Sequence, residues 1–237
     1  MARKRNENLI LAAIPEHDYR QLVPRLETME LRPGETLYAE AAPIGQLYFP
    51  TSAIVALQSA GAAGDTAEIG LIGNDGMVGV GALLGGNRAI GQSVVQSAGE
   101  SHRVGAAAFI ALFERSAGVR KVIMRYLRSV LVHAAQSAFC HRHHSLEQRL
   151  CRWLLQSLDR LPSRELRMTQ ELIGVMLGVR REAVTLAASR LQASGALHHS
   201  RGHLTVLRRD VLEKRACECY AALKAESEAL ARSLSGP

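Results

Sequence analysis

Short apolar runs separated by turn-forming residues fill the first half of the chain. Gly, Pro, Asn and Asp stand between these runs, each of which predicts a short strand. The expected strands are Thr36–Tyr38, Leu47–Phe49, Ile54–Leu57, Ala67–Ile72 and Ser93–Gln96. A spacing of about 8–12 residues between strands is typical of a small barrel or sandwich.

Helical periodicity flanks this β-rich part. Before it, Pro15–Met29 has an amphipathic pattern that Pro24 interrupts, and Arg32–Glu35 is the expected turn into the strands. After it, no proline stands between Ser116 and Ser137, and two apolar stripes step by three and four residues, which is coiled-coil spacing. The stripes are Ile123, Tyr126, Val130, His133 and Ser137, and Met124, Leu127, Leu131, Ala134 and Ala138.

Two stripes allow this long helix to pack on its own domain and on a second copy of the chain. The alternative is one wide stripe inside a single core. We expect the dimer helix, because Thr169–Gly202 has the pattern of a helix-turn-helix, and proteins with that motif usually pair. The predicted interface consists of Ile123, Tyr126, Leu127, Val130, Leu131 and Ala134.

The helical pattern breaks near Cys140–His144. Ser145, with Gln148 three residues later, has the pattern of a capping box, so a helix is expected over Leu146–Leu158. Asp210 begins the last expected helix, Val211–Leu230.

Two short helices joined by a tight turn are predicted downstream of the break. Thr169 is a good N-cap for the first helix, and Gly178 gives the turn its backbone freedom. Gly174 is small where the second helix must cross, and Val179 and Val184 would hold the two helices together. This is the pattern of a helix-turn-helix, which places side chains in the major groove of DNA.

Polar and charged side chains gather on the outer face of the second helix. Arg181 and Glu182 are the expected base readers, because Arg can take both acceptors of a guanine edge and Glu can accept from a cytosine amino group. Thr169 and Gln170 can offer backbone N–H groups to a phosphate. The alternative is a solvated charged face without a partner. The expected DNA-binding residues are Thr169, Gln170, Arg180, Arg181, Glu182, Thr185, Ser189, Arg190, Arg201 and Gly202.

A β-hairpin wing is expected after the second helix. Ala196–His199 and His203–Leu207 bracket Ser200–Gly202, with Arg201 at the tip as a phosphate contact. We therefore predict an α+β chain in three parts. They are a β-barrel or jelly-roll sensor domain (1–115), a dimerisation helix and hinge (116–144), and a winged helix-turn-helix domain (145–237).

The positive charge lies mainly in the C-terminal part. The chain carries a net charge of +7, of which residues 142–237 hold +6. Such an excess suits double-stranded DNA, an acidic membrane surface or no partner at all. No apolar run is long enough for a membrane span, the start of the chain lacks a signal-peptide pattern, and four cysteines make no disulfide framework. We expect a cytoplasmic protein with no membrane partner.

These motifs together resemble the Crp/Fnr superfamily of bacterial transcription regulators. The resemblance rests on Met168–Ile173 through Arg201–Gly202, after a long helix and a β-rich domain in which Tyr48–Pro50, Gly76–Gly79 and Val95–Gln96 fit a cyclic-nucleotide-binding-type barrel. It implies a homodimer joined through the long helix, with each winged helix reading half of a two-fold DNA site, and RNA polymerase as a partner.

The resemblance also assigns the base readers. Arg181 and Glu182 match the family's base-contacting pair, whereas Leu186 stands where the cyclic-AMP receptor carries another base-reading Arg. That departure predicts a different target sequence.

The sensor part departs from the family's pattern. Cyclic-AMP-binding members carry a Gly-Glu pair and a later Arg-Ser, where this chain has Gly79-Val80-Gly81 and a loop with Arg88 alone. Val80 cannot accept a ribose hydrogen bond, so cyclic AMP is not the expected effector, whose identity stays open. Gly79 and Arg88 are the candidate effector-binding residues. No cysteine precedes Cys140, so no iron–sulfur cluster of the N-terminal kind is expected, and nothing supports a haem ligand in the barrel.

Cysteine and histidine residues raise a second interpretation. Cys140 and His144 are one helical turn apart, but at a hinge where polar residues are ordinary, so we expect no metal. His141–His144 could instead titrate near neutral pH. Cys217 and Cys219, two residues apart on one expected helix, should point in different directions as buried thiols, with a redox role as the alternative.

The competing function is therefore a metal- or haem-dependent sensor that acts through protein contacts. No phosphate loop, hydrolase elbow or pair of catalytic carboxylates is present, so we expect no enzyme and no catalytic residue.

Overall fold

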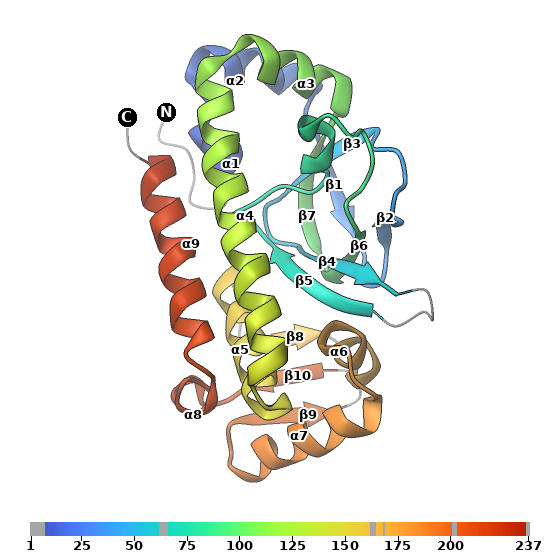
Figure 1. Ribbon diagram of the computed structural model, residues 1–237, viewed down its shortest axis with the longest axis vertical. Coiled ribbons are helices and arrows are strands. Elements are labelled where there is room, and N and C mark those ends of the chain that lie inside the picture. Colours follow the sequence, from blue (N-terminus) through green and yellow to red (C-terminus); the bar gives the residue numbers. More distant parts are fainter. Residues whose placement is uncertain (1–7, 62–65, 162–164, 168, 201–202, 236–237) are drawn as a thin grey trace.

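The computed structural model describes residues 8–61, 66–161, 165–167, 169–200 and 203–235. Figure 1 shows a β domain above a C-terminal domain, with one long helix, α4 (Ala117–His143), running along both. The α+β class and its β-rich first half are as predicted. No helix in the described part of the chain has the length and apolar character needed to cross a membrane.

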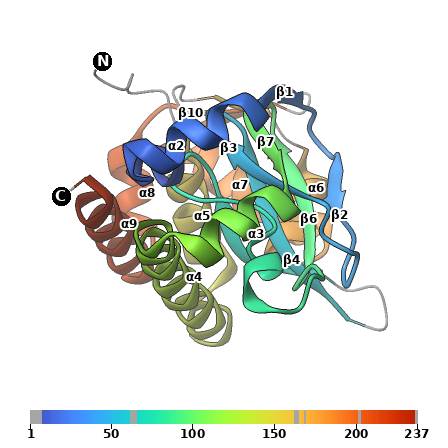
Figure 2. The ribbon, with the colours of Figure 1, turned by 90° about the horizontal axis from the view of Figure 1, so that it is seen from above.

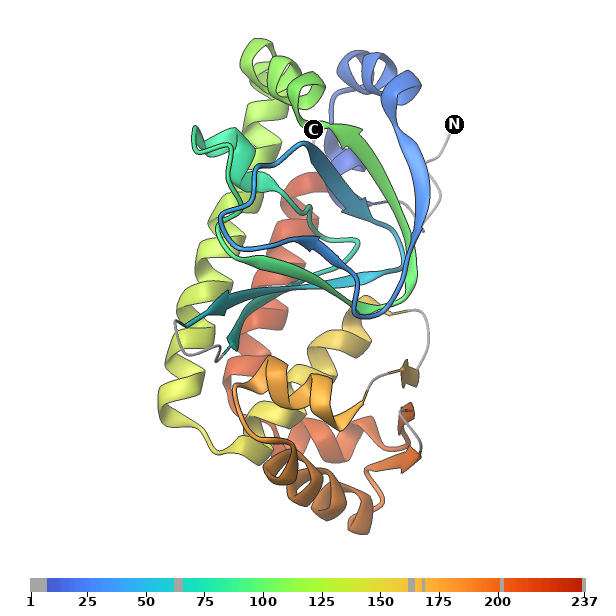
Figure 3. The same cartoon turned by 90° about the vertical axis from the view of Figure 1, so that its right-hand side faces the viewer.

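The β domain is a sandwich of two antiparallel sheets, with strand orders β1-β7-β3 and β2-β6-β4-β5 (Figure 3). Apolar side chains from both sheets fill the space between them, as in a jelly roll. Each of the five expected strands lies within an observed one, whereas β1 and β7 were not predicted. The strands are β1 (Glu27–Leu31), β2 (Thr36–Tyr38), β3 (Gln46–Pro50), β4 (Ile54–Ala60), β5 (Thr66–Ile72), β6 (Gln92–Ser97) and β7 (Gly99–Gly105).

The helical stretch expected over Pro15–Met29 ends earlier than predicted. Pro24 has no N–H to continue an α-helix, and the chain turns there and enters β1, where Met29 pairs with Ser101 of β7. The helical segments of this domain are α1 (Leu9–Ala13), α2 (Glu16–Leu22), η1 (Val23–Arg25), η2 (Val80–Leu84) and α3 (Ala106–Arg115).

Side-chain caps mark both ends of the connection between the domains. Ser116 caps α4 by accepting a hydrogen bond from the Val119 N–H, and α4 continues past the predicted end to His143. Ser145 and Gln148 then form the predicted capping box at the start of α5 (Leu146–Arg160).

In the described residues, the C-terminal domain combines α5 with a small sheet, β8-β10-β9, and four further helices. The predicted single helix Val211–Leu230 is wrong, because the backbone of Ala216 is extended and separates two helices. The elements after α5 are β8 (Glu165–Arg167), α6 (Gln170–Leu177), α7 (Arg181–Ala193), β9 (Leu197–Ser200), β10 (His203–Val206), α8 (Arg209–Arg215) and α9 (Cys219–Ser235).

Helix α9 returns along α4 toward the β domain. Figures 1 and 2 both show the two helices side by side. Near its end, α9 places Leu230 and Leu234 in the hydrophobic core of the β domain. The last helix therefore belongs to both halves of the molecule.

A second hydrophobic core joins the two domains directly. Ile54 and Leu71 of the β domain pack in one cluster with Trp153 and Met176 of the C-terminal domain. Trp153 Nε1 donates a hydrogen bond of 2.7 Å to Glu68 Oε2 within this buried junction. The C-terminal domain is thus docked on strands β4 and β5.

Candidate nucleic-acid interface

Helices α6 and α7 form the predicted helix-turn-helix. Thr169 Oγ1 accepts a hydrogen bond of 3.1 Å from the Leu172 N–H and caps α6. Gly178 ends α6 with φ of +63°, a conformation that favours glycine. A Cβ on Gly174 would lie 2.8 Å from the Val179 carbonyl oxygen, so only glycine allows the chain to pass this closely.

The two faces of α7 differ sharply. Its inner face buries Val184, Ala187, Ala188 and Leu191. Its outer face is exposed, at the lower end of the molecule in Figure 1. The exposed residues include Arg180, Arg181, Glu182, Thr185, Ser189 and Arg190, all of them predicted DNA contacts.

Thr185 and Gln170 contact each other across the motif. The Thr185 hydroxyl lies 2.7 Å from Gln170 Oε1 and 3.0 Å from the Arg181 carbonyl oxygen. The pair therefore links the starts of α6 and α7 and fixes how the outer face of α7 is presented. Arg201 and Gly202, the predicted wing tip, lie outside the described residues.

The strands of the wing are present on both sides of that tip. β9 and β10 pair antiparallel, with Leu197 opposite Val206, and both side chains are buried. β8 adds a third strand through Leu166, which lies opposite Leu204. β8 was not predicted, because its three residues form too short a pattern to indicate a strand.

The two stripes of α4 differ in burial, and part of the predicted dimer interface must be corrected. Ile123 and Tyr126 pack inside their own subunit, where the Tyr126 hydroxyl donates to the Met77 carbonyl oxygen at 2.9 Å. Neither can contact a second copy in this structure. Met124 and Leu131, on the second stripe, are 60% and 71% exposed. The second stripe is therefore the outward stripe, although two of its members, Leu127 and Ala134, are only partly exposed; it consists of Met124, Leu127, Leu131, Ala134 and Ala138.

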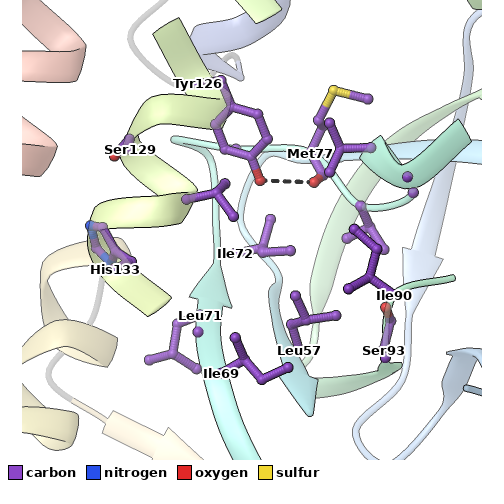
Figure 4. A pocket seen from close by; sticks show the side chains of 18 of the residues that line it. Leu57, Ile69, Leu71, Ile72, Met77, Ile90, Ser93, Tyr126, Ser129 and His133 are labelled. Carbon is purple, nitrogen blue, oxygen red and sulfur yellow. Dashed lines mark hydrogen bonds between the residues drawn. The ribbon is translucent and has the colours of Figure 1, made fainter. Parts of the chain in front are cut away.

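An apolar cavity of about 70 Å³ lies between the β domain and α4 (Figure 4). Of the two candidate effector-binding residues, Gly79 lines this cavity and Arg88 does not. The Arg88 side chain is exposed and donates to the Ala41 carbonyl oxygen at 2.8 Å. The apolar lining was not predicted, since it comes from separate strands and helices. Among the lining residues are Leu57, Ile69, Leu71, Ile72, Met77 and Ile90.

No described residue that lines this cavity offers a free positive charge at neutral pH. Arg160 pairs with Asp75 at 2.8 Å. Burial, with the neighbouring Arg160, lowers the pKa of His133 to about 4, so its imidazole is neutral. The cavity therefore differs from a phosphate-binding site.

The cysteines at the hinge and in the last helical segment lie together, contrary to expectation. Because the chain breaks between α8 and α9, Cys217 and Cys219 do not share one helix. Their sulfur atoms, Cys140 Sγ and a ring nitrogen of His144 all lie within 4.8 Å of one another. Local sequence could not predict this, since Cys140 and His144 lie more than 70 positions from Cys217 and Cys219.

Two family models match the chain. A cyclic nucleotide-binding domain model matches residues 28–116, and a Crp-like helix-turn-helix domain model matches residues 148–215. They account for most of the β domain and for the C-terminal domain as far as α8. A search of curated proteins with this sequence finds no match.

Solved structures of Crp/Fnr-type regulators share the fold. A transcriptional regulator of the Crp/Fnr family from Eubacterium rectale is 18% identical, with a TM-score of 0.68 over 88% of this chain and 99% of that one. FixK2 from Bradyrhizobium japonicum is 16% identical, with a TM-score of 0.65 over 81% of this chain and 98% of FixK2. The c-di-GMP-responsive global regulator CLP of Xanthomonas campestris is 17% identical, with a TM-score of 0.64 over 81% of this chain and 99% of CLP.

Proposed function

The chain belongs to the Crp/Fnr superfamily of transcription regulators, and on this premise we propose that it binds as a homodimer to a two-fold symmetric DNA site. The α7 of each subunit reads one half-site in the major groove. The outward stripe of α4 joins the two subunits. The output of the protein is DNA binding, which changes transcription through RNA polymerase in the cytoplasm, rather than catalysis.

The exposed face of α7 is the observation that supports this proposal most directly. Arg181 and Glu182 lie in its first turn, where a recognition helix contacts base edges. Leu186 is 57% exposed on the same helix, where an apolar side chain suits the methyl group of thymine. The excess of positive charge in residues 142–237 supplies attraction to the phosphate backbone.

Selection of bound fragments from a random DNA pool tests the proposal. We expect a two-fold symmetric consensus sequence. Arg181→Ala should then relax the preference at one base pair of each half-site, with a loss of about 1–3 kcal/mol in discrimination. Arg232→Ala, which removes an exposed arginine of α9, is the matched control and should leave the consensus unchanged. If Arg181→Ala keeps the sequence preference of the wild type, Arg181 does not read a base.

For the cavity, we propose a small uncharged apolar effector in place of cyclic AMP. The apolar lining, the paired Arg160 and the neutral His133 support this choice, as does Val80 at the position of a ribose-binding acid. Cyclic AMP should give no saturable shift of the unfolding temperature. A saturable rise would overturn this choice of effector while leaving DNA reading intact.

A further inference from the structure

We propose that Cys140, His144, Cys217 and Cys219 bind one zinc ion in tetrahedral geometry, at the junction between the long helix and the last two helices. All four potential ligand atoms lie within 4.8 Å of one another. Three thiolates and one imidazole are a ligand set that structural zinc sites use. The site is separate from the cavity under α4 and from the outer face of α7.

The distances match those expected around a single ion. Zinc–sulfur bonds of about 2.3 Å and zinc–nitrogen bonds of about 2.0 Å place tetrahedral ligand atoms about 3.8 Å apart for two sulfurs, and about 3.5 Å apart for sulfur and nitrogen. Cys140 Sγ and Cys217 Sγ are 3.5 Å apart, and Cys219 Sγ is 3.5 Å from His144 Nδ1. Small shifts of the side chains would complete the tetrahedron.

Two backbone features bring the ligands together. Cys140 and His144 are four residues apart at the end of α4, and therefore lie on one face of the helix. Cys217 stands in the break between α8 and α9, and Cys219 is the first residue of α9. The break lets both thiols face the end of α4, which a continuous helix would not allow.

The surroundings of the cluster orient its ligands. His144 Nε2 lies 3.1 Å from Glu218 Oε1, so the carboxylate can hold the proton on that nitrogen and leave Nδ1 free to bind a metal. Gln136 Nε2 donates to Cys219 Sγ at 3.0 Å, a hydrogen bond that stabilises a thiolate. A carboxylate on the second ring nitrogen is the usual partner of a metal-bound histidine.

Other uses of the cysteines fit the arrangement less well. A disulfide would join two sulfurs, and would give no role to His144 with its bound carboxylate. A polynuclear iron–sulfur cluster binds its ligands through different iron atoms, which keeps them farther apart than these four atoms lie. All three cysteines are buried and His144 is nearly so, and a site with four protein ligands and no open position is structural.

Binding would fix the hinge of the molecule. As the ion enters, three thiol protons leave to solvent and three sulfur–zinc bonds and one nitrogen–zinc bond form. These bonds join the last turn of α4, beside the capped start of α5, to the segment that leads into α9. On the proposed function, the ion thereby sets the position of the winged helix-turn-helix relative to the dimer helix.

Metal titration of the purified full-length protein tests the site. The protein is reduced, stripped with a chelator under anaerobic conditions, and titrated first with Co²⁺ and then with Zn²⁺. We expect one equivalent of Co²⁺ to give the absorption of a tetrahedral thiolate complex, and Zn²⁺ to displace it. The Cys217→Ser/Cys219→Ser double variant should lose this signal. Cys151→Ser, which changes a buried cysteine outside the cluster, is the matched control and should keep it.

A milder variant guards against a failure to fold. Glu218 is 72% exposed, so Glu218→Gln should fold normally and yet bind the metal about 10–100-fold more weakly, as expected when the carboxylate partner of a metal-bound histidine is lost. Failure of the reduced, folded protein to bind one equivalent of Co²⁺, or equal binding by the double variant, overturns the proposal.

DNA binding is measured on the same samples with and without Zn²⁺. Tighter binding in the zinc-loaded protein supports the role of the ion at the hinge, and equal affinity overturns that role while the metal site stands. Absence of sequence-specific binding in both samples overturns the proposed function, and the cobalt spectrum is unaffected by that result.

Discussion

At the scale of single residues, Glu68 is the least expected feature of the chain. In the sequence it is a polar position within an apolar strand, where an exposed carboxylate would be ordinary. In the structure the C-terminal domain covers it, and Trp153 Nε1 donates to it. Burial raises its pKa to about 7, against the nearby charge of Arg152 and the hydrogen bond of Trp153. Nothing in the sequence indicates this raised pKa, because its cause is the contact between the two domains.

The raised pKa of Glu68 predicts a pH-dependent stability difference. The folded state holds this proton more tightly than the unfolded state, so the contribution of Glu68 is fully present below about pH 4.5 and is lost as the pH rises through about 7. Glu68→Gln should therefore gain about 3 kcal/mol relative to wild type between pH 4.5 and pH 8. Urea unfolding of both proteins across this range measures the difference.

Comparing the two proteins removes the effect of two histidines. Burial lowers the pKa of His133 and that of His141 to about 4, so their contributions change in the opposite direction, being lost as the pH falls through 4. These contributions are common to wild type and Glu68→Gln and cancel. Glu30→Gln, at an exposed position of β1, is the matched control. A constant difference between Glu68→Gln and wild type would contradict the prediction.

At the scale of elements, patterns within one segment were predictable and breaks caused by distant packing were not. The five predicted strands, the capping box at Ser145 and the helix-turn-helix depend on neighbours in sequence, and all are present. The break between α8 and α9 has no local cause, because Ala216, Cys217 and Glu218 include neither proline nor glycine. After the break, α9 packs along α4, and these contacts join residues far apart in the chain. That is also why the cysteine cluster was missed.

The proposed dimer interface on the outward stripe of α4 can be tested by a single substitution. Leu131→Asp should raise the Kd of the dimer about 100-fold or more, because a two-fold interface loses two leucine side chains worth about 1.5–3 kcal/mol each. Sedimentation equilibrium measures this constant. Leu84→Asp changes a leucine that is 55% exposed on the β domain and should leave the Kd unaltered. An unchanged constant for Leu131→Asp would exclude this stripe as the interface.

At the scale of the whole molecule, the order of the domains was predictable and their contact was not. Composition shifts and motifs placed a β-rich part before a helix-turn-helix. Nothing in the sequence indicated that Ile54 and Leu71 pack with the C-terminal domain rather than within their own. Apolar residues on both faces of a strand are compatible with either arrangement.

The shared core predicts one cooperative unfolding transition. Trp153 is the only tryptophan, and it lies fully buried in the junction, so its fluorescence reports on the contact between the domains. Thermal unfolding followed by this fluorescence should coincide with unfolding followed by far-ultraviolet circular dichroism. A change in fluorescence at a clearly lower temperature would mean that the domains separate before they unfold.

The return of α9 to the β domain also affects how the protein is made. Leu230 and Leu234 belong to the same core as residues near position 10, so the first domain to leave the ribosome lacks part of its interior for most of translation. The nascent chain must expose the apolar surface that Leu230 and Leu234 later cover until residue 234 has left the ribosome. Completion of the N-terminal half is thereby coupled to synthesis of the DNA-reading half, and a polypeptide cut short before α9 carries neither a finished interior nor a complete regulator.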